Sequence, residues 1–402
     1  MINLRLTRAL DKYLGIFLCY FLIYLNKLIA LGAHRAENGQ VKKILMIKFV
    51  GIGNLVMILP TIKAIRKRYP DARIDMFTLV QNKEVLQNNS FINNTYFITN
   101  RNLYSFVFEY VAHAIRLRRE KYDLILDFEQ FAKTSTVFGL MIGGRERIGF
   151  DTPGQGRGIG YTKKVAYLDY KHMVETFFRI AKGAGVEKAD LSPLKLNITD
   201  EERKRTEQFL KDNHVEKDDI FIGIHMGSGI NMMTQRRWEN DKFARLADQL
   251  IDKYRIKIIF TGAGDDEAEL VGHTLTMMKN SVINAANKLT LKELAVLIEK
   301  SCFFISNDTA PIHIASAMGT PVVGFYGPNT PYLYGPRGGN DLVFYRDLFC
   351  SPCITNYNSK ISRCEHPICM EGISVEAVFE GIEKKYFLTN TCEYRRQHAV
   401  SV

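Results

Sequence analysis

Three side chains that could bind a ligand stand close together late in the chain: Asp308, Thr309 and His313. They follow the apolar run 302–305, and helical spacing continues from them to Met318. A second apolar run at 322–326 completes the pattern of one βαβ unit. In open α/β sheets, free backbone N–H groups and the positive end of the helix dipole face outward where the first strand ends. The pattern therefore predicts an anion-binding site at the start of the helix.

A simpler interpretation of the same residues remains open. Asp is a preferred capping residue, so Asp308 could serve only as a helix cap and His313 as a partly exposed helix residue. A ligand site is favoured by the Pro- and Gly-rich sequence GFYGPNTPYLYGP at 324–336, whose turns would place a second loop over the same strand edge. Thr309 and His313 lie one turn apart and share a helix face, so both would point at this space.

A second polar loop follows the apolar segment that begins at Ile220. Ser228 stands in the position of a phosphate-facing turn, and Arg236 with its neighbours Arg-Trp precedes the next helical segment. Paired guanidinium N–H groups can clamp a diphosphate and stabilise the charge that grows on a leaving nucleotide. The alternative is a surface basic pair beside a packed Trp238. Gly262, after the next predicted strand, begins a turn where a nucleoside would rest.

An earlier glycine turn follows the strand pattern KKILMIKFV at 42–50. Gly51 and Gly53 allow close approach of a ligand to the backbone, but Val56 replaces the third glycine of a dinucleotide fingerprint. We therefore expect a Rossmann-like first βα unit without a bound dinucleotide. A nicotinamide-dependent oxidoreductase remains an alternative.

The segment at Asp308 resembles the signature of glycosyltransferase family 9, the heptosyltransferase family, in which Asp-Thr-Gly-x-x-His-x-Ala contacts the nucleotide-sugar donor. Ala310 stands where that family usually has Gly. Arg236 matches the cation of the family's Lys/Arg-x-Trp run, which meets the donor phosphates, and Leu289 matches a nucleobase-facing position. The resemblance covers roughly residues 43–386. It implies an α/β protein of the GT-B fold, with two Rossmann-like domains facing a central cleft, the donor in the C-terminal one and the acceptor against the N-terminal one.

The first loop departs from this family at one position. Family members commonly have Gly-Asp there, and the Asp is the proposed general base, whereas this chain has Asn54. An amide cannot remove a proton near neutral pH, but it can orient a hydroxyl by hydrogen bonding. Asp127, Glu129 and Asp151 are the candidates for a displaced base, and each could instead be an ordinary loop carboxylate or cap. The glycine-rich sequence around Asp151 predicts a flexible lid on the acceptor side.

Composition and charge narrow the possible partners. The chain has 402 residues, 46% of them hydrophobic, which leaves room for two domains. Its 54 basic and 43 acidic residues give a net charge of +11, which favours nucleotide diphosphates, anionic lipids or nucleic acid. No nucleic-acid-binding motif is present in the sequence, so we expect no nucleic acid as partner.

The predicted divisions of the chain are an N-terminal segment 1–40, an acceptor domain 41–195, a donor domain 196–386 and a frayed tail 387–402.

The N-terminal segment contains a run of twelve apolar residues, Leu14 to Leu25. This run is shorter than the ~20 residues needed to span a bilayer, and no small-x-small cleavage site follows it. Basic residues flank it at Arg5, Arg8, Lys12, Lys27 and Arg35. The pattern favours a helix lying in the membrane interface, with a transmembrane span and a buried core helix as alternatives. The catalytic body would then be cytoplasmic and peripheral on the inner face of the cytoplasmic membrane.

The late cysteines Cys350, Cys353, Cys364 and Cys369 resemble a four-thiolate zinc site in residue type. Their spacing is looser than in standard zinc sites, so we favour plain thiols and no metal. The expected reducing cytoplasm argues against disulfides.

The predicted function is inverting, metal-independent transfer of a sugar, heptose or similar, from a nucleotide-diphosphate donor to a lipid-linked glycan such as lipopolysaccharide, without a cofactor. Arg236 and the helix start at Thr309 would hold the diphosphate, while Asp308 and His313 orient the donor. Because Asn54 cannot act as a base, a non-catalytic protein that binds nucleotide sugars is an alternative. A hydrolase or epimerase acting on the same donor is another.

Overall fold

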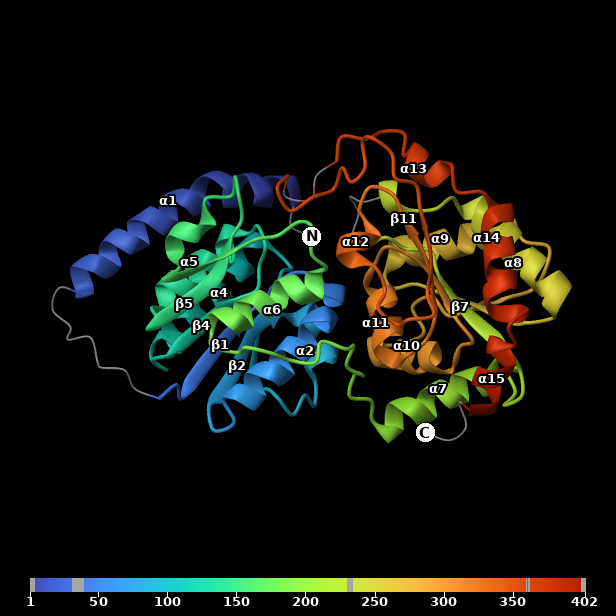
Figure 1. Ribbon diagram of the computed structural model, residues 1–402, viewed down its shortest axis with the longest axis horizontal. Helices are drawn as coiled ribbons and strands as arrows, with labels where there is room; N and C mark the ends of the chain where they lie inside the picture. Colours follow the sequence, from blue (N-terminus) through green and yellow to red (C-terminus); the bar gives the residue numbers. More distant parts are fainter. Residues whose placement is uncertain (1–3, 31–39, 230–233, 359, 361, 399–402) are drawn as a thin grey trace. The chain divides into compact units, whose positions relative to one another are not determined.

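The chain forms two compact units in the computed structural model, which describes residues 4–30, 40–229, 234–358, 360 and 362–398. Unit 1 comprises Met1–Leu191 and Thr355–Ile361, and unit 2 comprises Ser192–Ile354 and Ser362–Val402. Each unit is built on its own six-stranded sheet (Figure 1). The first crossing between units lies after Leu191, whereas the domain boundary predicted from the sequence lies after residue 195.

The sheet of unit 1 is parallel and has the order β3-β2-β1-β4-β5-β6. Its strands are β1 (Lys43–Ile47), β2 (Arg73–Leu79), β3 (Asn94–Ile98), β4 (Leu124–Asp127), β5 (Glu146–Asp151) and β6 (Lys163–Ala166). The strand order reverses at β1, which pairs with both β2 and β4. At such a switch point the loops leave the sheet in opposite directions, and ligands bind beyond the strand ends.

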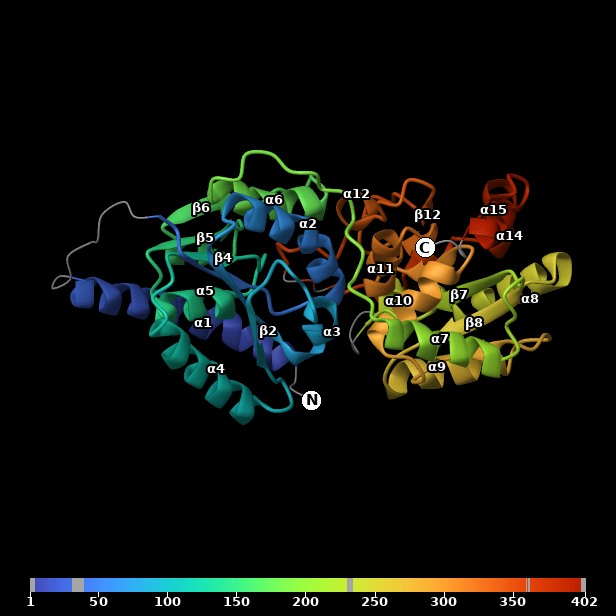
Figure 2. The same cartoon turned by 90° about the horizontal axis from the view of Figure 1, so that it is seen from below.

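Helices cover both faces of this sheet. Helices α1 (Leu4–Ala30), α4 (Leu103–Arg118) and α5 (Lys133–Ile142) lie on one face, and α2 (Ile52–Arg68) and α6 (Met173–Gly183) on the other (Figures 1 and 2). The shorter elements are η1 (Val80–Asn82), α3 (Lys83–Leu86) and η2 (Arg157–Gly160). The strands between the layers are almost continuously apolar, as expected for a sheet buried on both sides.

Helix α1 packs one of its faces against α5. The Asp11 carboxylate accepts hydrogen bonds from the amides of Lys133 and Thr134 and so caps the start of α5. Cys19 lies in an apolar cluster with Val137 and others of α5. No described helix combines the length and apolar character needed to cross a membrane. One side of α1, the predicted interfacial helix, packs on α5, and another side exposes apolar side chains.

The sheet of unit 2 has the order β12-β11-β10-β7-β8-β9, and all its pairs are parallel. Its strands are β7 (Phe221–His225), β8 (Lys257–Thr261), β9 (Ile283–Asn284), β10 (Phe304–Asn307), β11 (Val322–Tyr326) and β12 (Leu342–Tyr345). Its helices are α7 (Asp200–Asp212), η3 (Thr234–Arg236), α8 (Asn240–Tyr254), α9 (Asp265–Leu275), α10 (Leu291–Lys300), α11 (Ala310–Met318), α12 (Pro331–Tyr334), α13 (Ile368–Glu371) and α14 (Val375–Ile382). The βαβ unit predicted at 302–326 is confirmed as β10, α11 and β11.

Two helices of unit 2 begin with a capping box. Thr199 opens α7 and exchanges side-chain and backbone hydrogen bonds with Glu202, and Thr290 does the same with Glu293 at α10. Both boxes satisfy amide donors that a helix start leaves unpaired. Both follow the sequence pattern Thr-x-x-Glu, which is typical of a capping box.

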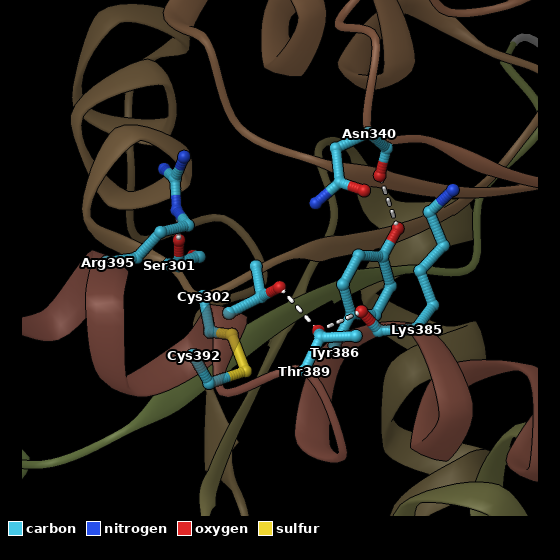
Figure 3. Close-up of a disulfide and its surroundings, with 9 residues drawn as sticks. Ser301, Cys302, Asn340, Lys385, Tyr386, Thr389, Cys392 and Arg395 are labelled. Atoms are coloured by element: carbon cyan, nitrogen blue, oxygen red, sulfur yellow. Dashed lines mark hydrogen bonds between the residues drawn. A yellow bond between two sulfur atoms is a disulfide. The ribbon is translucent and has the colours of Figure 1, made fainter.

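The C-terminal helix is bound to the rest of unit 2 at Cys392 and Arg395. After a π-helical turn at Glu383–Phe387, α15 (Thr391–His398) is joined by a disulfide between Cys392 and Cys302 to the segment just before β10 (Figure 3). Arg395 donates hydrogen bonds to the carbonyls of Ser301 and Gly319. The expectations of a frayed tail and of no disulfide were therefore wrong for these residues. The two cysteines lie 90 positions apart, which hid the pairing from sequence inspection.

A short C-terminal segment belongs to unit 1. Gln155 donates from Nε2 to the carbonyl of Tyr357, at 2.8 Å, and of Asn356, at 3.3 Å. The Asn356 amide donates to the Tyr167 hydroxyl, and the rings of Tyr167 and Tyr357 meet edge to face. These contacts explain why Thr355–Ile361 clusters with a unit from which it is far in sequence.

Candidate functional site

The carboxyl ends of β7 and β10 carry the first group of predicted donor-site residues. Arg236 Nη1 lies 3.1 Å from Asp308 Oδ2 and 2.9 Å from the Asp308 carbonyl oxygen, and Arg236 Nη2 donates to the Ser228 carbonyl at 3.2 Å. Asn329 donates to the same Asp308 oxygen from Nδ2 at 2.8 Å. The structure thus joins two predicted donor-site residues that stand on different loops, 72 positions apart in the sequence. It also adds Asn329, from the Pro- and Gly-rich loop predicted to cover this edge.

Trp238 fixes the position of the preceding arginines. It is fully buried, its backbone amide donates to Asn307 Oδ1 at 2.9 Å, and its ring stacks on Phe325 with centroids 4.5 Å apart. Asn307 in turn donates to the Met226 carbonyl. Because an aromatic side chain of this size anchors the chain in the core, Arg236 is held at the strand edge. The alternative that Trp238 is packed on the domain is correct for the ring and compatible with a ligand-facing Arg236.

Helix α11 begins beside this ion pair. Thr309 occupies the N-cap position without a side-chain capping bond, and Pro311 lies in the first turn. Within the part of the chain that the structure describes, the amides of Thr309 and Ala310 donate no hydrogen bond. His313 follows within one turn and is buried. The Asp308 carboxylate is bound by Arg236 and Asn329, so the helix start keeps amide donors for an anion.

The other predicted donor-site residues lie around the same sheet edge. Ser228 is buried and its Oγ accepts from Arg237 Nε at 3.0 Å, so its hydroxyl holds an arginine. Gly262 follows β8, and its carbonyl accepts from the Asn287 amide at 2.9 Å. This bond ties the turn after β8 to the loop that contains Leu289, which is half-buried just before α10. The structure thus places Gly262 and Leu289 on neighbouring loops.

Unit 1 carries a buried ion pair where β1 and β4 end. Lys48 Nζ lies 2.8 Å from Glu129 Oε2, and both side chains are almost fully buried. Glu129 Oε1 accepts from the amides of Phe49 at 2.7 Å and Val50 at 2.9 Å. Burial lowers the pKa of Lys48, against the attraction of Glu129. For Glu129, burial acts to raise the pKa, but the charge and hydrogen bond of Lys48 together with the Val50 amide lower it overall. The carboxylate therefore holds the backbone that leads into the first loop.

Asp127 belongs to a second buried network. Its Oδ2 accepts from Arg157 Nη2 at 2.8 Å and from the Tyr161 hydroxyl at 2.6 Å, and its Oδ1 accepts from the Glu129 amide. Arg157 is fully buried and also bonds the carbonyl of Glu129. The segment predicted to be a flexible lid is thus fixed at Arg157, so that prediction was wrong for η2.

Asn54 and Asp151 are the remaining predicted residues of this unit. Asn54 is half-buried in the first turn of α2, after Gly51, whose φ of 99° is a conformation that glycine adopts readily. Asp151 ends β5 and is exposed, with Oδ2 4.0 Å from Lys164 Nζ. A Cβ at Gly158 would lie 2.0 Å from Asp151 Oδ1, so glycine leaves room for this carboxylate. β5 lies two strands from β1 in the sheet, roughly 10 Å away.

The late cysteines show no arrangement for a metal. Among the described residues, no group of three or more His, Cys, Asp or Glu side chains is placed to hold an ion. Cys353 Sγ lies 3.1 Å from Ser362 Oγ, and Cys350 is exposed. Burial raises the pKa of Cys369 to about 11, with smaller contributions from neighbouring thiols. None of these four cysteines forms a disulfide within the part of the chain that the structure describes.

Solved structures with the same architecture include the glycosyltransferase family 9 protein of Veillonella parvula and the ADP-heptose lipopolysaccharide heptosyltransferase II of Escherichia coli. The first superposes with a TM-score of 0.72 at 22% identity, over 85% of this chain and 96% of that one. The second gives a TM-score of 0.67 at 20% identity, over 87% of this chain and 99% of that one. The predicted GT-B fold is confirmed by this likeness and by the two parallel sheets.

Sequence comparison gives the family. Lipopolysaccharide heptosyltransferase 3 of Escherichia coli is 25% identical over 305 residues, which cover 73% of this chain and 86% of the relative. The model of glycosyltransferase family 9 (heptosyltransferase) matches residues 110–361, more than half of the chain and including the Arg236 and Asp308 loops. The protein is therefore a glycosyltransferase and belongs to family 9, the heptosyltransferase family.

Proposed function

We propose that the protein transfers heptose from ADP-heptose to a lipopolysaccharide acceptor, with inversion at the anomeric carbon and without a metal ion. The observation that carries this proposal is the Arg236–Asp308 pair beside the amides at the start of α11. The heptosyltransferase names of its relatives supply the sugar, the nucleotide and the acceptor.

Positive charge for the leaving group comes from the protein in this proposal. Arg236 forms an ion pair with Asp308, and the amides of Thr309 and Ala310 lie at the positive end of the α11 dipole. A diphosphate bound there would accept hydrogen bonds from both sources as negative charge grows on it. Asp308, paired with Arg236 and hydrogen-bonded by Asn329, would orient the donor sugar with His313.

The chemical step exchanges one bond for another. The oxygen of an acceptor hydroxyl forms a bond with the anomeric carbon of heptose, and the bond from that carbon to the ADP oxygen breaks. ADP leaves with the electron pair, and the hydroxyl proton passes to a carboxylate. Attack from the face opposite to ADP inverts the configuration.

Asp151 is the general base that we favour. Asp127 is buried with both oxygens engaged, and Glu129 is buried against Lys48, whereas the Asp151 carboxylate is exposed. A base must reach the proton that it removes, which favours the exposed group. Asn54, near the start of α2, would position the acceptor hydroxyl by hydrogen bonding.

The acceptor implies a location. Lipopolysaccharide is anchored in a membrane by its lipid, so we propose that the enzyme works on the inner face of the cytoplasmic membrane. The exposed apolar face of α1 supports this placement.

A nucleotide panel tests donor binding. We expect ADP-heptose to raise the melting temperature of the wild type by linkage, more than UDP- or GDP-sugars do. Arg236→Ala and Asp308→Ala should remove the shift and the transfer activity. Arg245→Ala serves as control, because Arg245 is an exposed arginine of α8 paired with Asp241. Unchanged donor stabilisation in both site variants would refute the donor site.

Two conservative variants test the base. Asp151→Asn should lower kcat by about 10²-fold, a typical contribution of general base catalysis, and leave donor stabilisation unchanged. Asn54→Asp separates the alternatives: a faster rate than wild type would return the base role to position 54 and contradict the assignment to Asp151. Donor binding with no transfer to any acceptor would favour the non-catalytic alternative that Asn54 suggests.

A further inference from the structure

Helix α4 presents an apolar face to solvent. The exposed side chains recur at helical spacing on one side of the helix: Leu103, Tyr104, Val107, Phe108, Val111 and Ile115. Tyr104 is 84% exposed and Phe108 68%. The opposite side, with Tyr110, Ala114 and Leu117, is buried in the core of unit 1. The helix is thus apolar on both sides, although one of them is open to water.

Helix α1 presents a similar face. Its exposed side chains are Leu14, Phe17, Tyr20, Phe21, Tyr24 and Leu25. Phe17 and Tyr24 are each more than 60% exposed. The opposite side packs on α5 through Cys19 and its neighbours. Two helices of unit 1 therefore each leave an aromatic stripe uncovered.

The two helices flank the same element. At the start of α5, Asp11 of α1 binds the Thr134 amide, and the Tyr110 hydroxyl of α4 donates to the Thr134 carbonyl at 2.5 Å. Towards its end, Asn26 of α1 donates to the Leu140 carbonyl, and Arg118 of α4 donates to the Met141 carbonyl. Both helices therefore run in the direction of α5, on the same face of the sheet (Figure 2).

Charge favours an anionic partner for this face. Glu109 is the acidic residue within α4, and its carboxylate is held by the amide and hydroxyl of Thr99. Four basic residues follow the apolar stripe, at Arg116, Arg118, Arg119 and Lys121. Glu120 stands among them, but its carboxylate is paired with Lys43 and Arg73. Aromatic residues with basic residues beside them are typical of surfaces that insert into the headgroup region of anionic bilayers. A second copy of the chain would instead bring the same basic cluster against itself.

We propose that α4 and α1 together form one docking face for an anionic lipid bilayer, with α4 as its second anchor. Tyr104 and Phe108 enter the interface, and the basic residues at the end of α4 contact lipid phosphates. The proposal rests on the proposed function for the identity of the membrane, but its test needs neither donor nor acceptor.

Vesicle co-sedimentation of the full chain tests the face. Wild type should bind vesicles of phosphatidylcholine mixed with phosphatidylglycerol, bind pure phosphatidylcholine weakly, and lose binding as salt rises. The double variants Tyr104→Ser/Phe108→Ser and Phe17→Ser/Tyr24→Ser should each weaken partitioning at least about tenfold, because two aromatic side chains no longer leave water. Phe349→Ser is the control, because Phe349 is fully exposed in unit 2.

The outcomes are distinct. Circular dichroism confirms that each variant is folded, and the single variant Tyr104→Ser replaces the double one if that one is not. Anionic vesicle binding that the α4 variant leaves unchanged would overturn the proposal, as would a dimer that the α4 variant dissociates. Heptose transfer to a lipid-free acceptor fragment should be unchanged in the α4 variant. If the wild type transferred no heptose to this fragment, the proposed function would be refuted. The vesicle experiment would still test the docking face.

Discussion

The two sheets of the protein use charge in opposite ways at their carboxyl edges. In unit 1 the ion pairs Lys48–Glu129 and Arg157–Asp127 are at most 2% exposed. In unit 2 the pair at the corresponding place joins Arg236, whose side chain is 17% exposed, to Asp308. One edge thus closes its charges inside the fold, and the other keeps a cation at the surface beside amide donors.

Charged side chains at the two sheet edges therefore have different roles. Glu129 and Asp127 accept hydrogen bonds from backbone amides of the edge itself, so they shape the loops of unit 1. Arg236 bonds Asp308 and Ser228 from a side chain that is 17% exposed, so part of its guanidinium lies at the surface where a ligand could reach it. A buried carboxylate at a strand end is therefore weak evidence for catalysis when an arginine or lysine already neutralises it.

The sequence offers a probe that separates the two units. Trp238 is the only tryptophan of the chain, and it lies in the core of unit 2. Its fluorescence follows unfolding of unit 2, whereas circular dichroism follows both units.

The largest effect is expected from Glu129→Gln. The substitution leaves Lys48 buried without its carboxylate, and breaking a buried ion pair by removing one partner costs about 3–5 kcal/mol. Urea unfolding followed by circular dichroism should show this loss, and the Trp238 fluorescence transition should keep its midpoint. The exposed pair offers a matched comparison, because Asp151→Asn removes a carboxylate 4.0 Å from Lys164 and should cost under about 1 kcal/mol. Equal costs for the two variants would contradict the difference drawn between buried and exposed charges.

The same residue gives a pH dependence. The pKa of Glu129 is lowered in the folded protein, so its contribution is present above the unfolded pKa of about 4.3 and is lost as pH falls through the folded value. Wild type should lose stability of unit 1 on acidification, and Glu129→Gln should flatten this part of the profile.

The disulfide gives the second effect, and it should fall on unit 2. Cys392→Ser opens a loop of 90 positions, and removing such a cross-link costs about 2–4 kcal/mol. The Trp238 fluorescence transition should move to lower urea, and dithiothreitol should reproduce the shift in wild type. Cys350→Ser, at an exposed free thiol, is the control. If dithiothreitol shifted the fluorescence transition of Cys392→Ser as much as that of the wild type, the disulfide would not be the source of the shift.

Local patterns in the sequence were enough for much of the fold. Gly319 after a helical run marked the end of α11, and Thr290 with Glu293 marked the start of α10, because capping chemistry acts between neighbours in the chain. The predicted donor residues fall on the edge of one sheet, because the ends of parallel strands meet there.

Long-range pairing was not visible in the same way. Arg236 lies 72 positions from Asp308, and Cys302 lies 90 from Cys392, so neither pair leaves a periodic signal. Arg157 stood in a glycine-rich stretch that predicted flexibility, whereas Asp127 and Tyr161 bind it in the core. Charge partners inside a fold depend on which strands become neighbours, and no local pattern records that.

The third effect concerns the accessible pair of unit 2. Arg236→Lys keeps the charge but removes the guanidinium fork that bonds Asp308 and Ser228 at once. We expect donor affinity to fall about tenfold to a hundredfold, the value of one or two charge-assisted hydrogen bonds, in calorimetric titration with ADP-heptose. Arg237→Lys should cost less, because Arg237 bonds the Ser228 hydroxyl. If Arg237→Lys lowered donor affinity more than Arg236→Lys, the diphosphate would have to bind at Arg237.

The smallest effect tests whether the late segment Thr355–Ile361 stabilises unit 1. Gln155→Ala removes the two hydrogen bonds that its amide donates to the carbonyls of Asn356 and Tyr357, at about 0.5–1.5 kcal/mol each. The circular dichroism transition should lose about 1–2 kcal/mol, the Trp238 transition should not move, and limited proteolysis should cut the segment sooner. Gln249→Ala, on α8 of unit 2, controls for loss of a glutamine. If Gln155→Ala shifted the fluorescence transition instead, the segment would stabilise unit 2. Its assignment to unit 1 would then be wrong.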